Sequence, residues 1–104
     1  MTSNINKNLS FNQKLQIESK VLNRLIEHLQ NRTDVQNIDL MNLSGFCRNC
    51  LSKWYSEAAN EFGLTIDKDQ SREIIYGMPH KDWKEKFQKE ANEDQLTKFK
   101  TIKK

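Results

Sequence analysis

The sequence has few of the residues that form tight loops or build common catalytic motifs. Of its 104 residues, three are glycine, two are cysteine and one is proline. The glycines lie at positions 45, 63 and 77, too far apart for a glycine-rich loop that binds a nucleotide phosphate. The motifs G-x-S-x-G, H-E-x-x-H and H-x-E with P-C-x-x-C are also missing, so serine hydrolases, zincins and zinc deaminases lack their marker residues. The sequence therefore favours a protein without catalytic activity.

Long apolar runs are missing as well. No stretch approaches the roughly 18 apolar residues that a membrane span requires. The opening residues MTSNINKNLS have neither the basic start nor the apolar centre of a signal peptide. We therefore expect a cytoplasmic protein with no membrane contact, in which thiols stay reduced and no structural disulfide joins Cys47 to Cys50.

The surplus of positive charge is confined to one end of the chain. The formal net charge is +3, yet residues 1–78 hold nine Lys and Arg against nine Asp and Glu. Residues 79–104 hold eight Lys and no Arg against five Asp and Glu. Four of these lysines lie in the last seven residues, KFKTIKK. A charged chain end is more often solvated than shaped to bind phosphates. We therefore do not expect nucleic acid as a partner.

Length and composition indicate one domain. A chain of 104 residues suits a single hydrophobic core, and 36% hydrophobic with 30% charged residues is typical of a globular protein. We expect a disordered N-terminal tail over residues 1–10, one helical domain over residues 11–97, and a basic C-terminal tail over residues 98–104.

Apolar residues recur at helical spacing, and no segment alternates as a half-buried strand would. Ser10 and Gln13 form a capping-box pattern in front of a helix predicted over residues 11–31. The polar segment NRTDVQNID then predicts a turn. A second helix is expected from about residue 39 to residue 62, with Gly63 ending it.

Three shorter helices are expected in the second half of the chain. Asp67 with Gln70 predicts the start of one, and Gly77 predicts its end. Pro79 suits the first turn of another. Asn92 with Gln95 predicts a last turn or two. The fold class that follows is all-α, a single small domain with an irregular array of four to five short helices.

Residues 45–55, GFCRNCLSKWY, contain both cysteines and raise the question of a chemical site. A redox site needs a thiolate, which the start of a helix favours. If Ser44 is an N-cap, Cys47 lies in the first turn. If the helix begins near Asp39, Cys47 lies in mid-helix, and the helix start does not stabilise its thiolate. The apolar stripe that begins at Leu40 favours the continuous helix, although Gly45 inside a helix costs about 1 kcal/mol relative to alanine.

A metal site is a second interpretation of the two cysteines. Structural zinc requires about four ligands, and Cys47 with Cys50 provides two. His28 lies beside the apolar stripe of the first helix and is the best candidate for a third ligand, whereas His80 follows Pro79 at a helix start. A zinc-like site of Cys47, Cys50 and His28 is therefore an alternative to a protein without a cofactor.

A third interpretation places both cysteines in the core. Free cysteine is among the most buried residue types, and Cys47 and Cys50 share a helical stripe with Leu43, Leu51 and Trp54. We favour this interpretation over the redox and metal sites.

The same stripe indicates which side chains are free to contact a partner. Arg48 and Asn49 are expected to point away from it, and Tyr55 lies at its edge, so these three are the predicted binding surface. Our leading hypothesis is a binding module that docks a protein partner or self-associates. The alternative is a thiol or metal protein that uses Cys47 and Cys50.

Several longer runs support a family assignment. The run NRTDVQNIDLMNLSGFCRNCLSKWY, followed by REIIYGMP and by Trp83 with Lys84, resembles a family of short bacterial proteins catalogued as domain of unknown function 1244. The resemblance extends from about Leu25 to Ala91. It implies an all-α fold of about four helices in a stand-alone protein, and it implies no activity, cofactor or partner.

Overall fold

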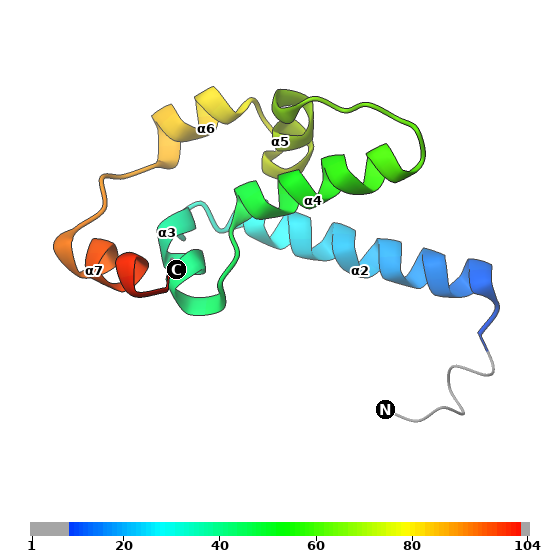
Figure 1. Ribbon diagram of the computed structural model, residues 1–104, viewed down its shortest axis with the longest axis horizontal. Coiled ribbons are helices and arrows are strands. Elements are labelled where there is room, and N and C mark those ends of the chain that lie inside the picture. The colour runs from blue at the N-terminus through cyan, green and yellow to red at the C-terminus, as the bar shows by residue number, and fades with distance from the viewer. Residues whose placement is uncertain (1–8, 103–104) are drawn as a thin grey trace.

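The computed structural model describes residues 9–102, which form helices joined by short loops and contain no strand (Figure 1). The all-α class and the single small domain are confirmed. The described part has six helices rather than the four or five expected. None of these helices is long and apolar enough to cross a membrane. The predicted N-terminal tail lies mostly outside the described residues, which begin at Leu9.

The first helix, α2 (Phe11–Asn31), has the predicted bounds. The Ser10 hydroxyl accepts the Gln13 backbone N–H at 3.1 Å, and the Gln13 side chain accepts the Ser10 N–H at 2.9 Å. These two bonds satisfy backbone donors that the first turn of a helix otherwise leaves free. The local capping signal therefore sets the start of α2.

The predicted second helix is two helices, α3 (Asn37–Ser44) and α4 (Arg48–Glu61), and the expectation of a continuous helix is wrong. Gly45 adopts a left-handed φ of 81° and donates its N–H to the Met41 carbonyl, which ends α3. Leu43, expected on the buried stripe, is 87% exposed. The alternative start at Ser44 does not occur either, because Cys47 is the N-cap of α4.

The remaining helices are α5 (Lys68–Tyr76), α6 (His80–Phe87) and α7 (Glu93–Ile102). Asp67 and Gln70 form the predicted capping box, and Gly77 ends α5 with a φ of 75°. Helix α7 continues to Ile102, so residues 98–102 of the predicted basic tail are helical.

The core lies where the C-terminal half of α2 meets α4 and α5. Ile26, Leu29, Leu51 and Ile75 form it, and Leu40 and Phe46 pack against it. An aromatic group of Tyr76, Trp83 and Phe87 extends it, with ring centroids 5.1 and 5.9 Å apart. The linker after α6 then crosses the molecule and brings α7 against α3 (Figure 1). The N-terminal half of α2 projects beyond these contacts.

Candidate functional sites

The break between α3 and α4 places Cys47 and Cys50 at the start of a helix. Cys47 is the N-cap of α4 in an extended conformation, and Cys50 lies one turn into the helix. Their Sγ atoms are 4.0 Å apart, and both thiols are free. A disulfide has its sulfur atoms about 2.05 Å apart, so the pair is in the reduced form.

The surroundings of Cys47 oppose formation of a thiolate. Cys47 is 7% exposed, and this burial raises its pKa above the ordinary value of a thiol. The backbone N–H groups of Cys50 and Asn49 lower the pKa in turn, but burial is the larger effect. The thiol of Cys47 is therefore a poor nucleophile at neutral pH.

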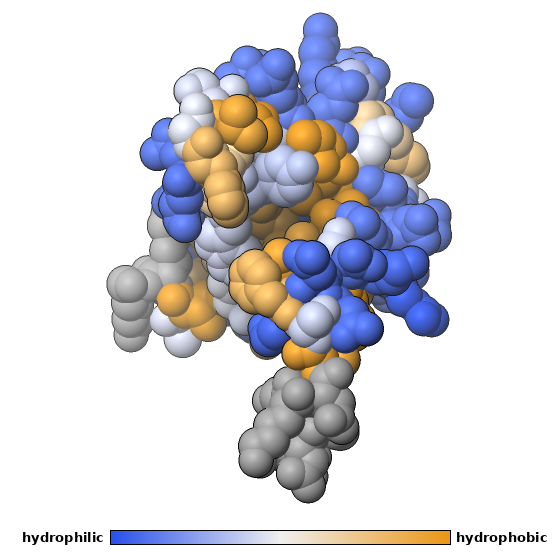
Figure 2. Space-filling view, turned by 90° about the vertical axis from the view of Figure 1, so that its right-hand side faces the viewer, coloured by the Kyte–Doolittle hydropathy of each residue, from blue (hydrophilic) through white to orange (hydrophobic). Residues whose placement is uncertain are grey.

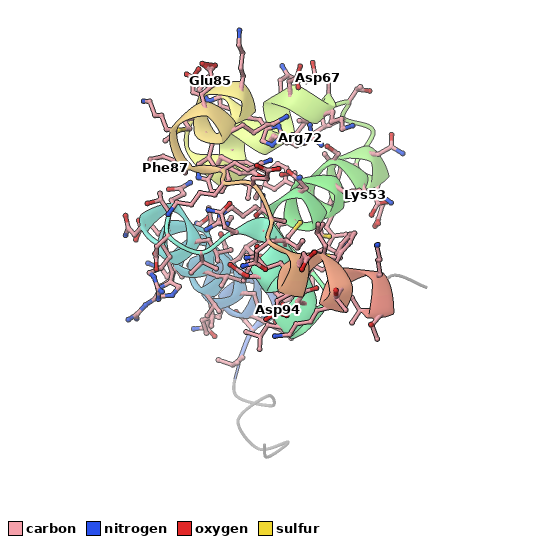
Figure 3. The ribbon with its side chains drawn as sticks, turned by 90° about the vertical axis from the view of Figure 1, so that its left-hand side faces the viewer. Lys53, Asp67, Arg72, Glu85, Phe87 and Asp94 are labelled. Carbon is pink, nitrogen blue, oxygen red and sulfur yellow. The ribbon has the colours of Figure 1, made fainter. Side chains whose placement is uncertain are left out.

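A cavity of about 490 Å³ adjoins both thiols. It lies between α3, the start of α4, the linker after α6 and α7, and Figure 3 views the side on which that linker crosses in front of α4. Met41 of α3 also lines it, with its Sδ 3.9 Å from the Cys50 Sγ. The cavity is thus bordered by three sulfur-containing side chains.

A chain of polar side chains forms part of this cavity wall. The Tyr76 hydroxyl donates to the Asn49 Oδ1 at 2.7 Å and accepts from the Asn37 Nδ2 at 2.9 Å. Asn49, predicted to be on a binding surface, is half-buried and uses its side-chain oxygen in this network. Asn49 therefore bonds to another residue of the core region and also lines the cavity.

His28 is not brought to the two cysteines. It lies exposed on α2, and no three His, Cys, Asp or Glu side chains in residues 9–102 lie close enough together to hold a metal ion. His80 lies elsewhere, against Tyr76 with ring centroids 5.0 Å apart. A conventional zinc site therefore lacks its third and fourth protein ligands in the described part of the chain.

The expectation that Arg48 points to solvent is wrong. Arg48 is 1% exposed, and its guanidinium donates hydrogen bonds to the carbonyl groups of Leu29, Arg32 and Val35. It also lies over the Trp83 ring, 4.9 Å from the centroid. Periodicity assigned Arg48 to the outside because the partners that bury it come from distant segments. Arg48 is thus a structural cation rather than a surface contact.

Tyr55 is on a surface, but that surface is apolar. It lines a groove of about 510 Å³ between α2, α4 and α5. The other lining residues are almost all hydrophobic: Leu22, Leu51, Trp54, Ala58, Ala59, Phe62, Leu64, Ile66 and Ile75. Figure 2 looks at the end of the molecule where this groove opens and shows hydrophobic residues gathered around a hollow with polar residues at its rim. The groove is therefore an apolar surface rather than an ordinary solvated one.

Two features of these sites were missed from the sequence. The sequence did not indicate that Met41 lies beside the cysteines, because it is nine residues from Cys50 in a segment that was expected to be one helix. The sequence partly indicated the groove, since the apolar stripe of the first helix was recognised but the groove between it and α4 was not.

The fold and sites define a small helical protein with an apolar groove and a pair of free thiols, of which Cys47 is buried and Cys50 is half-buried. The family model described as "Protein of unknown function (DUF1244)" matches residues 35–101, and the chain belongs to this family. The match covers α3 to α7, up to the last residue but one of α7, and leaves all of α2 outside. No curated protein matches the chain.

Proposed function

We propose that this protein is a self-associating binding module, and that a second copy of the chain covers the apolar groove. One observation carries this proposal. The face of α2 that enters the core at Ile26 and Leu29 continues toward the N-terminus, where Leu22, Leu15 and Phe11 lie at helical spacing on it. These three residues are 41%, 49% and 75% exposed. The core of a single copy therefore covers only half of the stripe.

The exposed apolar area is large enough for a protein interface. Eight large side chains contribute to it: Phe11, Leu15, Leu22, Leu25, Trp54, Tyr55, Phe62 and Leu64, which are between 36% and 82% exposed. With about 200 Å² for each such side chain when fully exposed, they present about 900 Å². A specific interface takes about 800 Å² from each partner, whereas the largest apolar patch of a typical monomer is about 300–600 Å².

A second copy suits this surface because each copy has both halves of the contact. The projecting half of α2 is amphipathic and exposes its apolar face. The groove beside α4 is lined by apolar side chains. A two-fold arrangement places each α2 in the groove of the other copy, which buries both at once. Charge agrees with this arrangement, since residues 11–22 have a net charge of +1 and residues 53–61 a net charge of −1.

The test is the molar mass of the full chain in solution, measured by sedimentation equilibrium over a range of concentrations. We expect twice the chain mass for the unmodified protein and a shift to the monomer for Phe62→Gln, since Phe62 lines the groove. Leu43→Gln is the matched control, because Leu43 is about as exposed as Phe62 but lies on α3 outside the groove. Leu15→Gln tests the projecting half of α2 and should behave as Phe62→Gln does.

Two results contradict self-association. One is an unmodified protein that stays monomeric at concentrations well above micromolar, which would leave the groove to a different protein. The other is equal masses for Phe62→Gln, Leu43→Gln and the unmodified dimer, which would place the dimer contact elsewhere.

A further inference from the structure

We propose that Cys47, Cys50 and Met41 bind one monovalent copper ion in a three-sulfur site between α3 and the start of α4. Two distances define the site. The Cys47 Sγ and Cys50 Sγ are 4.0 Å apart, and the Cys50 Sγ and Met41 Sδ are 3.9 Å apart. An ion in the plane of three sulfur atoms, about 2.3 Å from each, requires separations of about 4 Å between them. The two separations that involve Cys50 therefore already match those of such a site.

The donor set selects the metal. Thiolate and thioether sulfur are soft ligands, and among the common metals soft monovalent copper suits them. Structural zinc takes four thiolate, imidazole or carboxylate ligands. Glu90 lines the same cavity, but no His, Cys, Asp or Glu in residues 9–102 lies close enough to form a group of three ligands with the two cysteines. Monovalent copper is satisfied by two thiolates and one thioether, which is what this cavity offers.

The charges around the site fit a monovalent ion. Binding releases one proton from each thiol, so two thiolates and one Cu⁺ leave a net charge of −1 on the site. The buried Arg48 guanidinium directly follows Cys47 and interacts favourably with a negative charge there. The attraction to Arg48 therefore offsets part of the cost of burying a negative charge at Cys47.

The fold holds the three sulfur atoms in place and gives access to them. The backbone of Met41 is held in α3, because its carbonyl accepts the Gly45 N–H that ends this helix, and its Sδ lies against the Cys50 Sγ. Cys50 is half-buried on the wall of the cavity of about 490 Å³, which Lys89 and Phe99 also line. An ion can therefore reach Cys50 first and then complete its ligand set with the more buried Cys47.

The test is a titration of the reduced, full-length protein with monovalent copper under anaerobic conditions, in competition with a chromogenic chelator specific for that ion. We expect one copper per chain, and X-ray absorption should show three sulfur neighbours. Met41→Leu should weaken binding by roughly 10- to 100-fold, the loss typical for removal of a supporting metal-site group, and reduce the sulfur neighbours to two. Met78→Leu is the matched control, since Met78 is also half-buried but does not line this cavity, and it should bind as the unmodified protein does.

Four results overturn the proposal. They are no copper taken from the chelator, one copper shared by two chains, binding unchanged by Met41→Leu, and tight one-to-one zinc binding without copper binding. Circular dichroism of Met41→Leu establishes that the variant is folded, so its result cannot be ascribed to loss of structure. The site lies apart from the groove, and molar mass measured on the same samples separates its failure from that of self-association.

Discussion

Arg48 links the C-terminal end of α2 to α4 through a set of hydrogen bonds that involves no carboxylate. Its Nη2 donates to the Leu29 and Arg32 carbonyls at 3.0 and 2.8 Å, and its Nη1 donates to the Val35 carbonyl and the Asn37 Oδ1 at 2.8 and 3.0 Å. Carbonyls at the end of a helix carry partial negative charge, so they suit a cation. Burial lowers the pKa of Arg48, but a guanidinium stays protonated in proteins.

We predict that Arg48→Met destabilises the protein by about 3–5 kcal/mol, because buried acceptors that lose their hydrogen-bond donor cost about 1–3 kcal/mol each. The methionine removes this donor from the buried bond to the Leu29 carbonyl and from the part-buried bonds to the Arg32 and Val35 carbonyls, and it also removes the contact with Trp83. The gain from no longer burying a charge offsets part of this loss. The stability of Arg48→Lys should lie between those of Arg48→Met and the unmodified protein. The lysine ammonium keeps the charge but cannot donate in the fixed directions of the planar guanidinium.

The measurement is urea unfolding followed by far-UV circular dichroism. Arg32→Met is the matched control, because the Arg32 side chain is half-exposed and pairs with Asp34 at the surface. Such pairs contribute about 0–1 kcal/mol. If Arg48→Met costs no more than Arg32→Met, the guanidinium is not a structural cation and the argument from its hydrogen bonds is refuted.

Three further predictions concern the thiols, the last helix and a histidine. Iodoacetamide should modify Cys50 faster than Cys47 in the folded protein, since Cys47 is buried and its pKa is raised; equal rates in peptide mass spectra would contradict this. Deletion of residues 98–104 should leave α2 to α6 helical but lower stability by about 1–2 kcal/mol through loss of half-buried Phe99, which thermal melts can check. Burial, followed by Arg72 and Lys84, lowers the pKa of His80. Its contribution to stability should be complete above about pH 6.5 and fall as the pH drops through the lowered pKa, and His80→Gln should remove this dependence.

The helix boundaries that sequence could predict are those set by bonds within a few residues. Ser10 with Gln13, Asp67 with Gln70, and Asn92 with Gln95 each form the expected pair of side-chain and backbone bonds, all between residues three apart. A pattern of this kind contains its own partner, so the sequence alone is enough to identify it.

The sites could not be predicted because their partners are distant in sequence. Arg48 is buried by carbonyls 13 to 19 residues away and by Trp83, none of which a helical repeat around Arg48 can indicate. Periodicity identifies a face of a helix but does not identify what covers it. For the same reason the apolar stripe of α2 was recognised while its exposure toward the N-terminus was not.

Gly45 is the residue on which the sulfur site depends. In a continuous helix Met41 and Cys50 would be nine residues, or about 13 Å, apart along the axis, whereas the turn at Gly45 brings their sulfur atoms to 3.9 Å. A Cβ at Gly45 meets no atom within 4 Å, so Gly45→Ala adds only the strain of a left-handed backbone, about 1–2 kcal/mol. Gly63→Ala is the matched control, since Gly63 has a φ of 75° and equally open surroundings in the loop after α4. We expect both variants to lose similar stability in urea, but only Gly45→Ala to weaken copper binding, because the strain there favours a continuous helix that separates Met41 from Cys50. Equal copper affinity in the two variants would show that the turn does not assemble the site.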